Sequence, residues 1–344
     1  MKCTENFDLF DLTGADKLAA DSVEARDALI REYANNDDIK CHFYLSDSAG
    51  KDSQFAKLKV LELVPHHKIT VVHANLTSEV EHDGVIEHIE KFTPPAIPVE
   101  VVQNPYRNLI DGILLRGKFM GGIARFCTSD YKVQQIDKFI RKDMKARGIK
   151  VAFNVTGIRA AESKMRSMKN PLFINKRLTT KSRTVYDWMP IFDASEDATY
   201  DAIYASGQHP HPAYGERGEK YSRLSCAFCY MASKGDLKEG AKQYPDKYAS
   251  YIAIERVLDH SMFFKKVNGG AVKVSLEERA GVQVDELLVE QYVKAHTARQ
   301  KRLLEAKREA DLAKEIAKKE REAGVLMLED GFFFIFYWCF AFVL

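Results

Sequence analysis

Apolar residues in the first half of the chain occur in short β-type runs that alternate with longer amphipathic stretches. Runs rich in β-branched and aromatic residues predict four strands, at residues 41–46, 68–74, 97–102 and 150–156. Between them, residues 81–91 and 129–144 carry apolar positions at helical spacing. Strands that alternate with amphipathic helices favour parallel pairing, so we expect an α/β fold whose parallel sheet has helices on both faces.

The pattern divides the chain into four segments. We expect a helical lead-in at 1–35, the α/β domain at 36–255, a helical extension at 256–330 and an apolar tail at 331–344. Residues 165–225, inside the domain, are rich in loop signals such as glycine, proline and serine. Long loops in a compact domain are usually functional or disordered.

The extension contains one long charged helix, predicted from about residue 284 to 323. Opposite charges one turn apart, such as Lys301 and Glu305, favour a helix exposed to solvent or to a protein partner. A coiled coil between two copies, or a contact with nucleic acid, is the alternative. The tail after Gly331 has 13 uncharged apolar residues. Because a spanning helix needs about 20, we expect no transmembrane span and a tail docked on the domain or on another subunit.

Composition narrows the class of protein without naming an activity. The 344 residues are 46% hydrophobic and 29% charged, as in ordinary globular proteins, and the net charge of +2 requires neither nucleic acid nor a membrane as partner. Six unevenly spaced cysteines do not resemble a disulfide framework, and the first residues show no secretory signal. We therefore expect a cytoplasmic protein.

A candidate phosphate loop follows the first predicted strand and opens a helix. Its sequence is SDSAGKDS, at residues 46–53. Small residues let the backbone approach a polyanion, and the free N–H groups at the start of a helix bind phosphate oxygens. Lys51 adds a point charge, and Asp52 is expected to hold the loop or a Mg²⁺ ion. The pattern differs from the P-loop of kinases, which requires Gly-x-x-x-x-Gly-Lys-Ser/Thr.

This loop resembles the PP-loop of the ATP-pyrophosphatase superfamily, whose signature is Ser-Gly-Gly-x-Asp-Ser after the first strand. Ala49 replaces the first glycine of that signature. Alanine accepts most turn conformations except those with positive φ.

Further segments resemble the phosphoadenosine-phosphosulfate (PAPS) reductase-like family, especially members from phages, plasmids and DNA phosphorothioation. They are HAN at 73–75, GIRAAES at 157–163 with Arg166, WMPI at 188–191, HPAY at 211–214 and RLSCAFC at 223–229. The resemblance covers about residues 40–255 and implies an adenine nucleotide α-hydrolase-like fold that binds ATP or PAPS. The nucleotide-binding residues it implies are Ser46, Ser48, Gly50, Lys51, Asp52, Ser53, His73, Asn75, Gly157, Arg159, Glu162 and Arg166. Asn75 stands where the family usually has an acid.

Three cysteines form a candidate metal site. Cys226 and Cys229 make a Cys-x-x-Cys pair, and Cys127 precedes a predicted helix. Thiolates favour iron–sulfur clusters and zinc, so we expect a metal centre, with a redox dithiol or ordinary thiols as alternatives. Related reductases with a 4Fe–4S cluster have a Cys-Cys pair where this chain has Cys127 alone.

Three functional hypotheses follow. The first is an ATP-dependent enzyme that adenylates a second substrate, releases pyrophosphate and transfers sulfur at the cysteines, with Lys51, Asp52 and Arg159 as catalytic residues. Its partners would be a sulfur donor and a small-molecule or nucleic-acid substrate. The second is a sulfonucleotide reductase that uses a thiol reductant, although the family's C-terminal Glu-Cys-Gly-like motif is absent. The third is a non-catalytic nucleotide-binding regulator.

Overall fold

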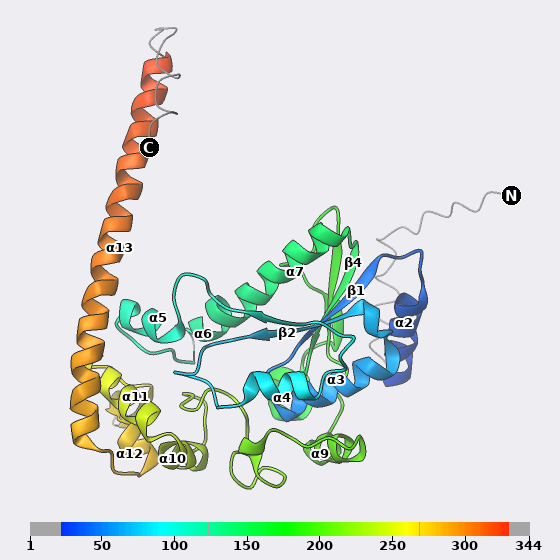
Figure 1. The fold of residues 1–344 in the computed structure, drawn as a ribbon, viewed down its shortest axis with the longest axis horizontal. Helices are drawn as coiled ribbons and strands as arrows, with labels where there is room; N and C mark the ends of the chain where they lie inside the picture. Colours follow the sequence, from blue (N-terminus) through cyan, green and yellow to red (C-terminus); the bar gives the residue numbers. More distant parts are fainter. Residues whose placement is uncertain (1–21, 123, 268, 330–344) are drawn as a thin grey trace, which may run out of the picture.

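A six-stranded sheet forms the centre of the molecule (Figure 1). This computed structural model describes residues 22–122, 124–267 and 269–329. The strands are β1 (Cys41–Ser46), β2 (Ile69–Ala74), β3 (Val99–Val102), β4 (Val151–Thr156), β5 (Leu172–Ile174) and β6 (Thr184–Trp188), in the order β3-β2-β1-β4-β6-β5. All neighbours pair in parallel except β5, which runs antiparallel to β6. The predicted parallel α/β sheet is confirmed.

Helices cover both faces of this sheet because its central strands are apolar on both sides. Along β1, Phe43 and Leu45 face one core, whereas Tyr44 faces the other. Helices α2 (Val23–Asn35), α3 (Lys51–Leu63) and α4 (Val85–Lys91) supply the first core. Helix α7 (Gln134–Arg147) lies across the second face, where Ile140 and Met144 pack on Tyr44 (Figure 1).

The fully buried strand β6 was not predicted. It lies in the region 165–225 that reads as loop, where lysine, serine and arginine precede the short run TVYDW. Its register pairs Phe153 of β4 with Tyr186, so the strand completes the sheet beside β4. The other short elements of this region are α8 (Lys164–Ser167), α9 (Glu196–Ala205) and the 3₁₀ turn Pro212–Tyr214. The polar residues around this run prevented the prediction of a strand, because the burial of β6 depends on tertiary contacts.

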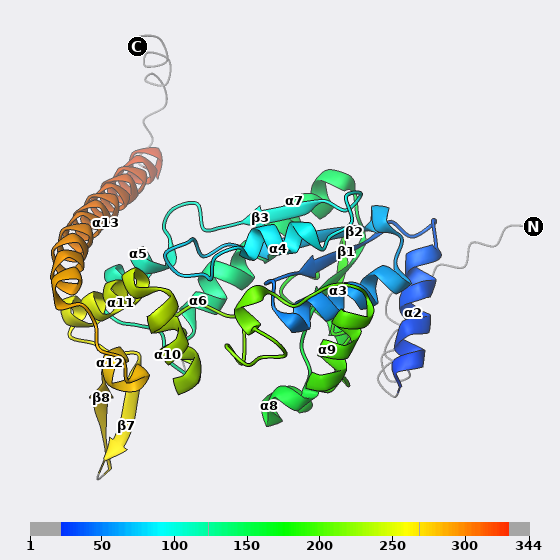
Figure 2. The same cartoon turned by 60° about the horizontal axis from the view of Figure 1, so that its bottom comes forward.

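A third hydrophobic core lies beyond the sheet and includes helices from distant parts of the chain. Its helices are α5 (Leu109–Arg116), α6 (Phe126–Thr128), α10 (Lys234–Gln243), α11 (Pro245–Leu258) and α12 (Leu276–Ala280). The antiparallel hairpin of β7 (Phe263–Val267) and β8 (Gly270–Val274) extends away from α12 (Figure 2). The predicted helix 129–144 is present, but it begins with a π-helical turn, Ser129–Val133, before it continues as α7.

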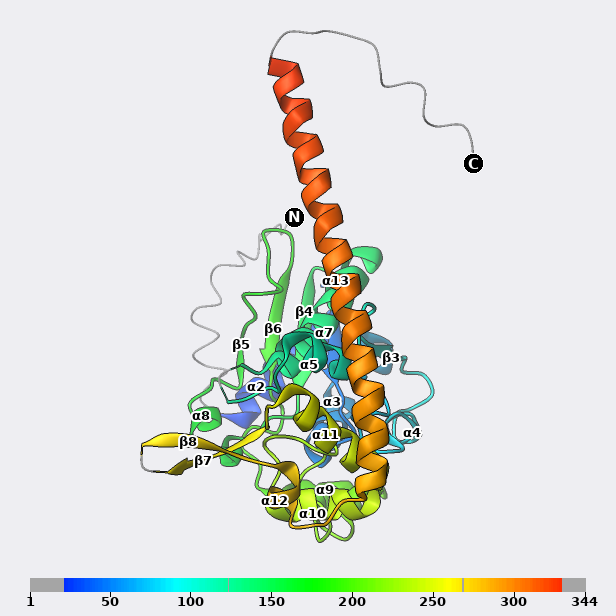
Figure 3. The ribbon, with the colours of Figure 1, turned by 90° about the vertical axis from the view of Figure 1, so that its left-hand side faces the viewer.

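The long charged helix is present as α13 (Glu286–Glu329). Its first part packs on α11 and α5, and the rest continues past the body of the protein (Figure 3). Arg299 fastens it to the body by donating hydrogen bonds to Glu79, Asp111 and Asn108. Within the described residues, no helix has the length and apolarity needed to cross a membrane. The apolar tail and most of the helical lead-in lie outside these residues.

Candidate functional site

The predicted phosphate loop lies where the strand order reverses. Strand β1 has β2 on one side and β4 on the other, and the chain leads outward from both. In open parallel sheets, ligands bind at such a switch point, outside the carboxyl ends of the strands. The loop after β1 (47–50) and the loop after β4 (157–159) meet there, which brings two of the predicted motifs together.

A buried ion pair shapes the phosphate loop. Asp47 accepts hydrogen bonds from Lys57 Nζ at 2.8 Å, Ser53 Oγ at 2.8 Å and the Ala49 N–H at 2.9 Å. Burial alone would raise the pKa of Asp47, but the Lys57 ammonium and these hydrogen bonds hold it below its usual value. Sequence reasoning missed this pair. The available signal was a lysine on the apolar face of α3, one turn before Val60.

The loop turns at Ala49, which has φ +58° and is buried. This is the left-handed region, where the methyl group costs about 1 kcal/mol relative to glycine. The hydrogen bond to Asp47 and the packing of the methyl group in the core hold alanine in this conformation. The loop therefore adopts a backbone conformation that suits the glycine of the resembled signature.

Two glycines allow the close approach of backbone segments at the switch point. A Cβ added to Gly157 would lie 2.4 Å from the carbonyl oxygen of Asp52, in the first turn of α3. A Cβ on Gly50 would lie 3.3 Å from Ser48 Oγ and 3.4 Å from the Tyr214 hydroxyl. Gly157 is thus required by packing, and Gly50 tolerates a side chain only if its neighbours shift.

The predicted charged residues are paired with one another or with α9. Arg159 donates to Asp52 Oδ1 at 2.6 Å, and Arg166 pairs with Glu162. Lys51 is 3% exposed and lies 3.1 Å from Glu196 of α9. A nucleotide phosphate that reaches Lys51 or Arg159 would have to exchange with these carboxylates.

The backbone at the start of α3 retains free donors. The N–H of Lys51 donates to the Tyr214 hydroxyl at 3.1 Å, and the N–H of Ser48 donates to Ser53 Oγ at 3.2 Å. In the part of the chain that the structure describes, the N–H groups of Gly50, Asp52 and Ser53 have no hydrogen-bond partner. Three unpaired donors at the start of a 13-residue helix suit an anion.

His73 joins the phosphate loop to the segment 223–229, which contains Cys226 and Cys229 and is called the cysteine loop below. Its Nδ1–H donates to the Asp47 carbonyl at 2.9 Å, and its Nε2 lies 3.4 Å from Glu81 Oε2. Burial opposes a charge on His73, but Glu81 and Asp47 outweigh it and raise the pKa of the imidazole above its usual value. Glu81 in turn forms an isolated β-bridge with Cys226. Through these contacts, His73 links the phosphate loop to the cysteine loop.

Tyr214 makes a second link between the two loops. Its hydroxyl accepts the N–H groups of both Lys51 and Leu224, each at 3.1 Å. Leu224 lies two residues before Cys226. The phosphate loop and the cysteine loop thus share one buried hydroxyl as well as the His73–Glu81 contact.

Asn75, one of the predicted nucleotide-binding residues, lies at a different point of the same sheet edge. Its Oδ1 accepts the Thr77 N–H at 2.7 Å, which helps to hold Thr77 at φ +78°. Asn75 also lines a cavity of about 240 Å³ between the ends of β2 and β3, together with Gln103 and Asn108. This places an amide-rich cavity beside the switch point.

The three predicted cysteines converge on the third core, beyond the sheet. Cys226 is buried in it, and Cys127 and Cys229 pack against it. Burial first, and then the charges of Cys229 and Cys127, raise the pKa of Cys226 well above its usual value, against the opposing charge of Lys132. The sulfur of Cys229 accepts the N–H of Met231 at 3.5 Å.

Sulfur donors suit iron or zinc, and two phenol hydroxyls around them, those of Tyr230 and Tyr251, have no hydrogen-bond partner among the described residues. As they stand, no three His, Cys, Asp or Glu side chains of the described residues are close enough to hold a metal ion.

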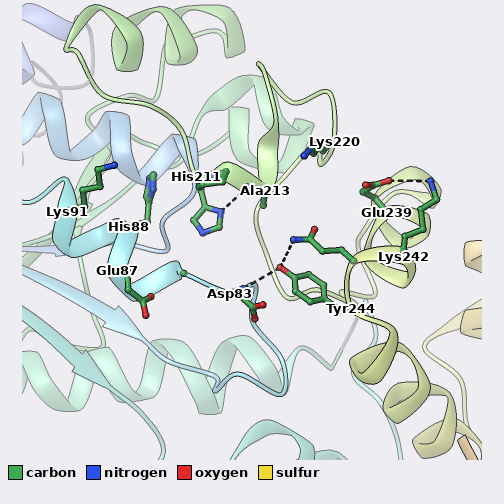
Figure 4. Close-up of a pocket in the computed structure, with 13 residues that line it drawn as sticks. Asp83, Glu87, His88, Lys91, His211, Ala213, Lys220, Glu239, Lys242 and Tyr244 are labelled. Atoms are coloured by element: carbon green, nitrogen blue, oxygen red, sulfur yellow. Dashed lines mark hydrogen bonds and ion pairs between the residues drawn. The ribbon is translucent and has the colours of Figure 1, made fainter. Parts of the chain in front are cut away.

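A larger cavity lies outside the predicted site. It has a volume of about 640 Å³ and lies between α4, the 211–220 segment and the end of α10 (Figure 4). Glu87 and Lys91 of α4 lie on one side, and Lys242 and Tyr244 lie on the other. It contains none of the predicted nucleotide or metal residues.

One contact connects this cavity to α3: the Nε2–H of His88 donates to Gln54 Oε1 at 3.3 Å. Burial lowers the pKa of His88 to about 4, so its imidazole is neutral at pH 7.

Comparisons with known proteins give distant similarities. No model of a protein family matches the chain. An uncharacterized 37.8 kDa protein in the gpa 5' region of Escherichia phage 186 is 24% identical over 220 residues, and the match covers 62% of this chain and 60% of that protein. The chain thus spans about 60% of the length of this curated relative.

Two solved structures have similar folds at low scores. A PAPS reductase from Candida auris, in a phosphate complex, has a TM-score of 0.36 at 10% identity and covers 58% of this chain and 88% of its own. The U34-tRNA thiolase NcsA from Methanococcus maripaludis, with its 4Fe–4S cluster, has a TM-score of 0.36 at 13% identity, covering 75% and 87%. Similarity at this level assigns no activity to this chain.

Proposed function

We propose that this protein is a PAPS reductase-like PP-loop enzyme that binds MgATP at the loop 46–53 and adenylates a second substrate. An oxygen of that substrate attacks the α-phosphorus, the bond between the α-phosphorus and the bridging oxygen breaks, and pyrophosphate leaves. Sulfide-level sulfur from a sulfur donor, held at the three cysteines, then attacks the activated carbon, so that a carbon–sulfur bond forms and AMP leaves. Positioning and charge neutralisation supply most of the rate, as is usual for phosphate chemistry.

One observation carries the proposal: the phosphate loop and the cysteine loop are joined at one edge of the sheet. His73 contacts the Asp47 carbonyl on one side and Glu81, the bridge partner of Cys226, on the other. Tyr214 joins the same two loops through backbone N–H groups. A nucleotide site coupled to thiols in this way suits activation of a substrate and delivery of sulfur to it.

The binding roles follow from the geometry of the loop. The N–H groups of Gly50 and Asp52 point a partial positive charge at the phosphates, and the helix dipole of α3 adds to it. Arg159 exchanges Asp52 for a phosphate oxygen, which leaves Asp52 available to a Mg²⁺ ion. Lys51 exchanges Glu196 for the β-phosphate or γ-phosphate, and Asn75 contacts the base or ribose.

The cysteine site would hold a metal centre through Cys127, Cys226 and Cys229. A bound metal ion or cluster would supply a Lewis acid that keeps the thiolates deprotonated and holds a sulfur atom. Lys132 offsets part of the negative charge that three thiolates bring, because its charge already opposes the raised pKa of Cys127 and Cys226.

The decisive experiment is a nucleotide assay. Protein is incubated with MgATP, and separately with PAPS and thioredoxin, while AMP, pyrophosphate, adenosine bisphosphate and sulfite are measured. We expect slow cleavage of ATP to AMP and pyrophosphate, rising when the acceptor is present. Lys51→Ala and Arg159→Ala should each reduce ATP affinity at least tenfold, which corresponds to about 1.4 kcal/mol.

Lys59→Ala is the matched control, because Lys59 lies on the same helix, is partly exposed and forms its ion pair, among the described residues, with Glu62. It should leave nucleotide affinity unchanged. Sulfite release from PAPS would replace the proposal with the reductase reaction. Tight binding without any product, with candidate acceptors present, would indicate a regulator. Absence of binding to either nucleotide would reject the phosphate-loop assignment.

A further inference from the structure

The cavity of about 640 Å³ beside α4 has a floor of uncharged rings (Figure 4). His88, His211 and Tyr244 line it, and all three are buried. Burial lowers the pKa of His88 to about 4 and also lowers that of His211, so both imidazoles are neutral at pH 7. A cavity of this volume with a largely uncharged floor suits the body of a small organic molecule.

The rim of this cavity carries charged side chains of both signs, and some of them already neutralise each other. Glu239 lies 3.5 Å from Lys242, and both line the cavity. Asp83, on the other side, pairs with Lys247 at 2.9 Å. These two pairs leave little charge for a ligand.

Three charged groups of the rim remain. Glu87, Lys91 and Lys220 are exposed, and none of them forms an ion pair with another residue that the structure describes. Glu87 and Lys91 are one turn apart on α4, a spacing at which opposite charges often pair, yet they do not pair here. Lys220 comes from the segment across the cavity, where its N–H donates to the Tyr214 carbonyl at 3.1 Å. The rim therefore offers one negative and two positive charges above an uncharged floor.

We propose that this cavity binds a small zwitterion, an amino acid or a short peptide with free ends. Its ammonium group contacts Glu87, its carboxylate contacts Lys91 and Lys220, and its apolar part lies over the rings of the floor. An anion without an ammonium group would leave Glu87 unpaired, and a cation would leave both lysines unpaired. Charge-assisted hydrogen bonds to both ends satisfy all three groups at once.

The cavity shares two walls with the phosphate loop. Pro212 and Ala213 line the cavity, and the next residue, Tyr214, accepts the Lys51 N–H at 3.1 Å. On the other side, His88 donates to Gln54 in the first turns of α3 at 3.3 Å. A zwitterion in the cavity therefore lies one residue away from contacts that shape the phosphate loop, although it contacts none of the predicted nucleotide-binding residues.

The test is equilibrium dialysis of the full chain against the tripeptide Ala-Phe-Ala in three forms: with free ends, N-acetylated and C-amidated. We expect the free form to bind about fivefold more tightly than either blocked form, because each block removes one charged contact at a partly exposed rim. Phenylalanine is dialysed in parallel. Tighter binding of the tripeptide would indicate a peptide ligand, and equal or tighter binding of phenylalanine would indicate a free amino acid.

Substitutions on the rim should remove each preference separately. Glu87→Gln should bind the free and the N-acetylated tripeptide equally, because the ammonium group has lost its partner. The double variant Lys91→Gln with Lys220→Gln should bind the free and the C-amidated tripeptide equally. Lys238→Gln is the matched control, because Lys238 is an exposed lysine of α10 that does not line the cavity. All of these positions are exposed, so the variants should fold normally.

Three results would reject the zwitterion site. The first is absence of binding of both the tripeptide and phenylalanine at millimolar concentration. The second is equal affinity of the wild type for the free and the blocked tripeptides, and the third is a Glu87→Gln protein that still prefers the free form over the N-acetylated form. The dialysis contains no nucleotide, so these results are independent of the nucleotide assay. Failure of ATP to bind would reject the phosphate-loop assignment and leave the zwitterion site in place.

Discussion

At the scale of single residues, polar groups predicted to face a nucleotide serve first to build the loop that would hold it. Ser53 closes the loop through Asp47 and the Gly50 carbonyl. Arg159 and Asp52 neutralise each other across the switch point. Binding of a nucleotide would therefore replace internal contacts rather than fill an empty charged cleft. This exchange reduces the net gain from each new contact with phosphate.

The conformation of Ala49 leads to a prediction about the loop. Ala49→Gly removes the strain of positive φ, about 1 kcal/mol, and loses a buried methyl group worth about 0.8 kcal/mol. These effects nearly cancel, so the free energy of unfolding should change by less than about 1 kcal/mol, and ATP affinity should not fall. Ala49→Val should destabilise the protein by more than 1 kcal/mol, because a β-branched side chain is disfavoured at this φ. Urea unfolding and ATP titration measure both.

Equal stability of Ala49→Val and the wild type would show that the loop can adopt another conformation at low cost. A large loss of ATP affinity in Ala49→Gly would show that the alanine methyl group itself shapes the site.

At the scale of elements, the candidate site depends on how closely α3 approaches the segment after β4. The N-terminus of α3 has no side-chain cap from Gly50, so its donors are left for a ligand. The absence of a side chain at Gly157 lets the next loop lie against the first turn of the helix. The site therefore depends on the packing of two connections, one after β1 and one after β4, that are distant in sequence.

Gly157→Ala tests this close approach. The added methyl group would collide with the backbone of Asp52 and Ser53, so we expect a loss of more than 2 kcal/mol of stability and a strong loss of ATP binding. Gly121→Ala is the control, because nothing lies within 4 Å of its added Cβ and its φ is not positive. Chemical unfolding gives the stability, and titration gives the affinity. A Gly157→Ala protein with normal stability and normal ATP binding would contradict the placement of the two loops.

At the scale of the whole molecule, buried histidines link stability to pH. Burial first, with nearby positive charges, lowers the pKa of four of them: His42 to about 3, and His82, His88 and His296 to about 4. Between these values and the unfolded pKa of about 6.5, the unfolded chain binds protons that the folded protein does not. Their contribution to stability is therefore complete above pH 6.5 and is lost as pH falls towards 4. His73 acts in the opposite direction, because its pKa is raised.

We expect the unfolding midpoint in urea to fall steeply between pH 6.5 and pH 4.5. Each neutral histidine contributes up to about 1.4 kcal/mol per pH unit. His88→Gln, which retains a donor for Gln54, should reduce this slope by up to that amount while leaving the stability at pH 7.5 within about 1 kcal/mol. A flat profile between pH 7.5 and pH 4.5 would show that these imidazoles gain protons without leaving their buried positions.

The local sequence determined the sheet and the order of its motifs. Strand Cys41–Ser46 matches its prediction to the residue, and β2, β3 and β4 begin one or two residues later than predicted. The long helix was predicted in type and was placed within two residues at its start. These features follow from periodicity and from residues adjacent in the chain, which is the information a sequence pattern carries.

Only the tertiary structure decided which groups meet. Arg159 reaches Asp52 across 107 positions of the chain, Lys51 lies beside Glu196, and the unpredicted strand β6 becomes buried only because β4 lies next to it. The partnerless hydroxyl of Tyr251 likewise exists only because α11 packs against the cysteine loop. Such pairings depend on how distant segments pack, and a local sequence pattern carries no information about which distant segments become neighbours.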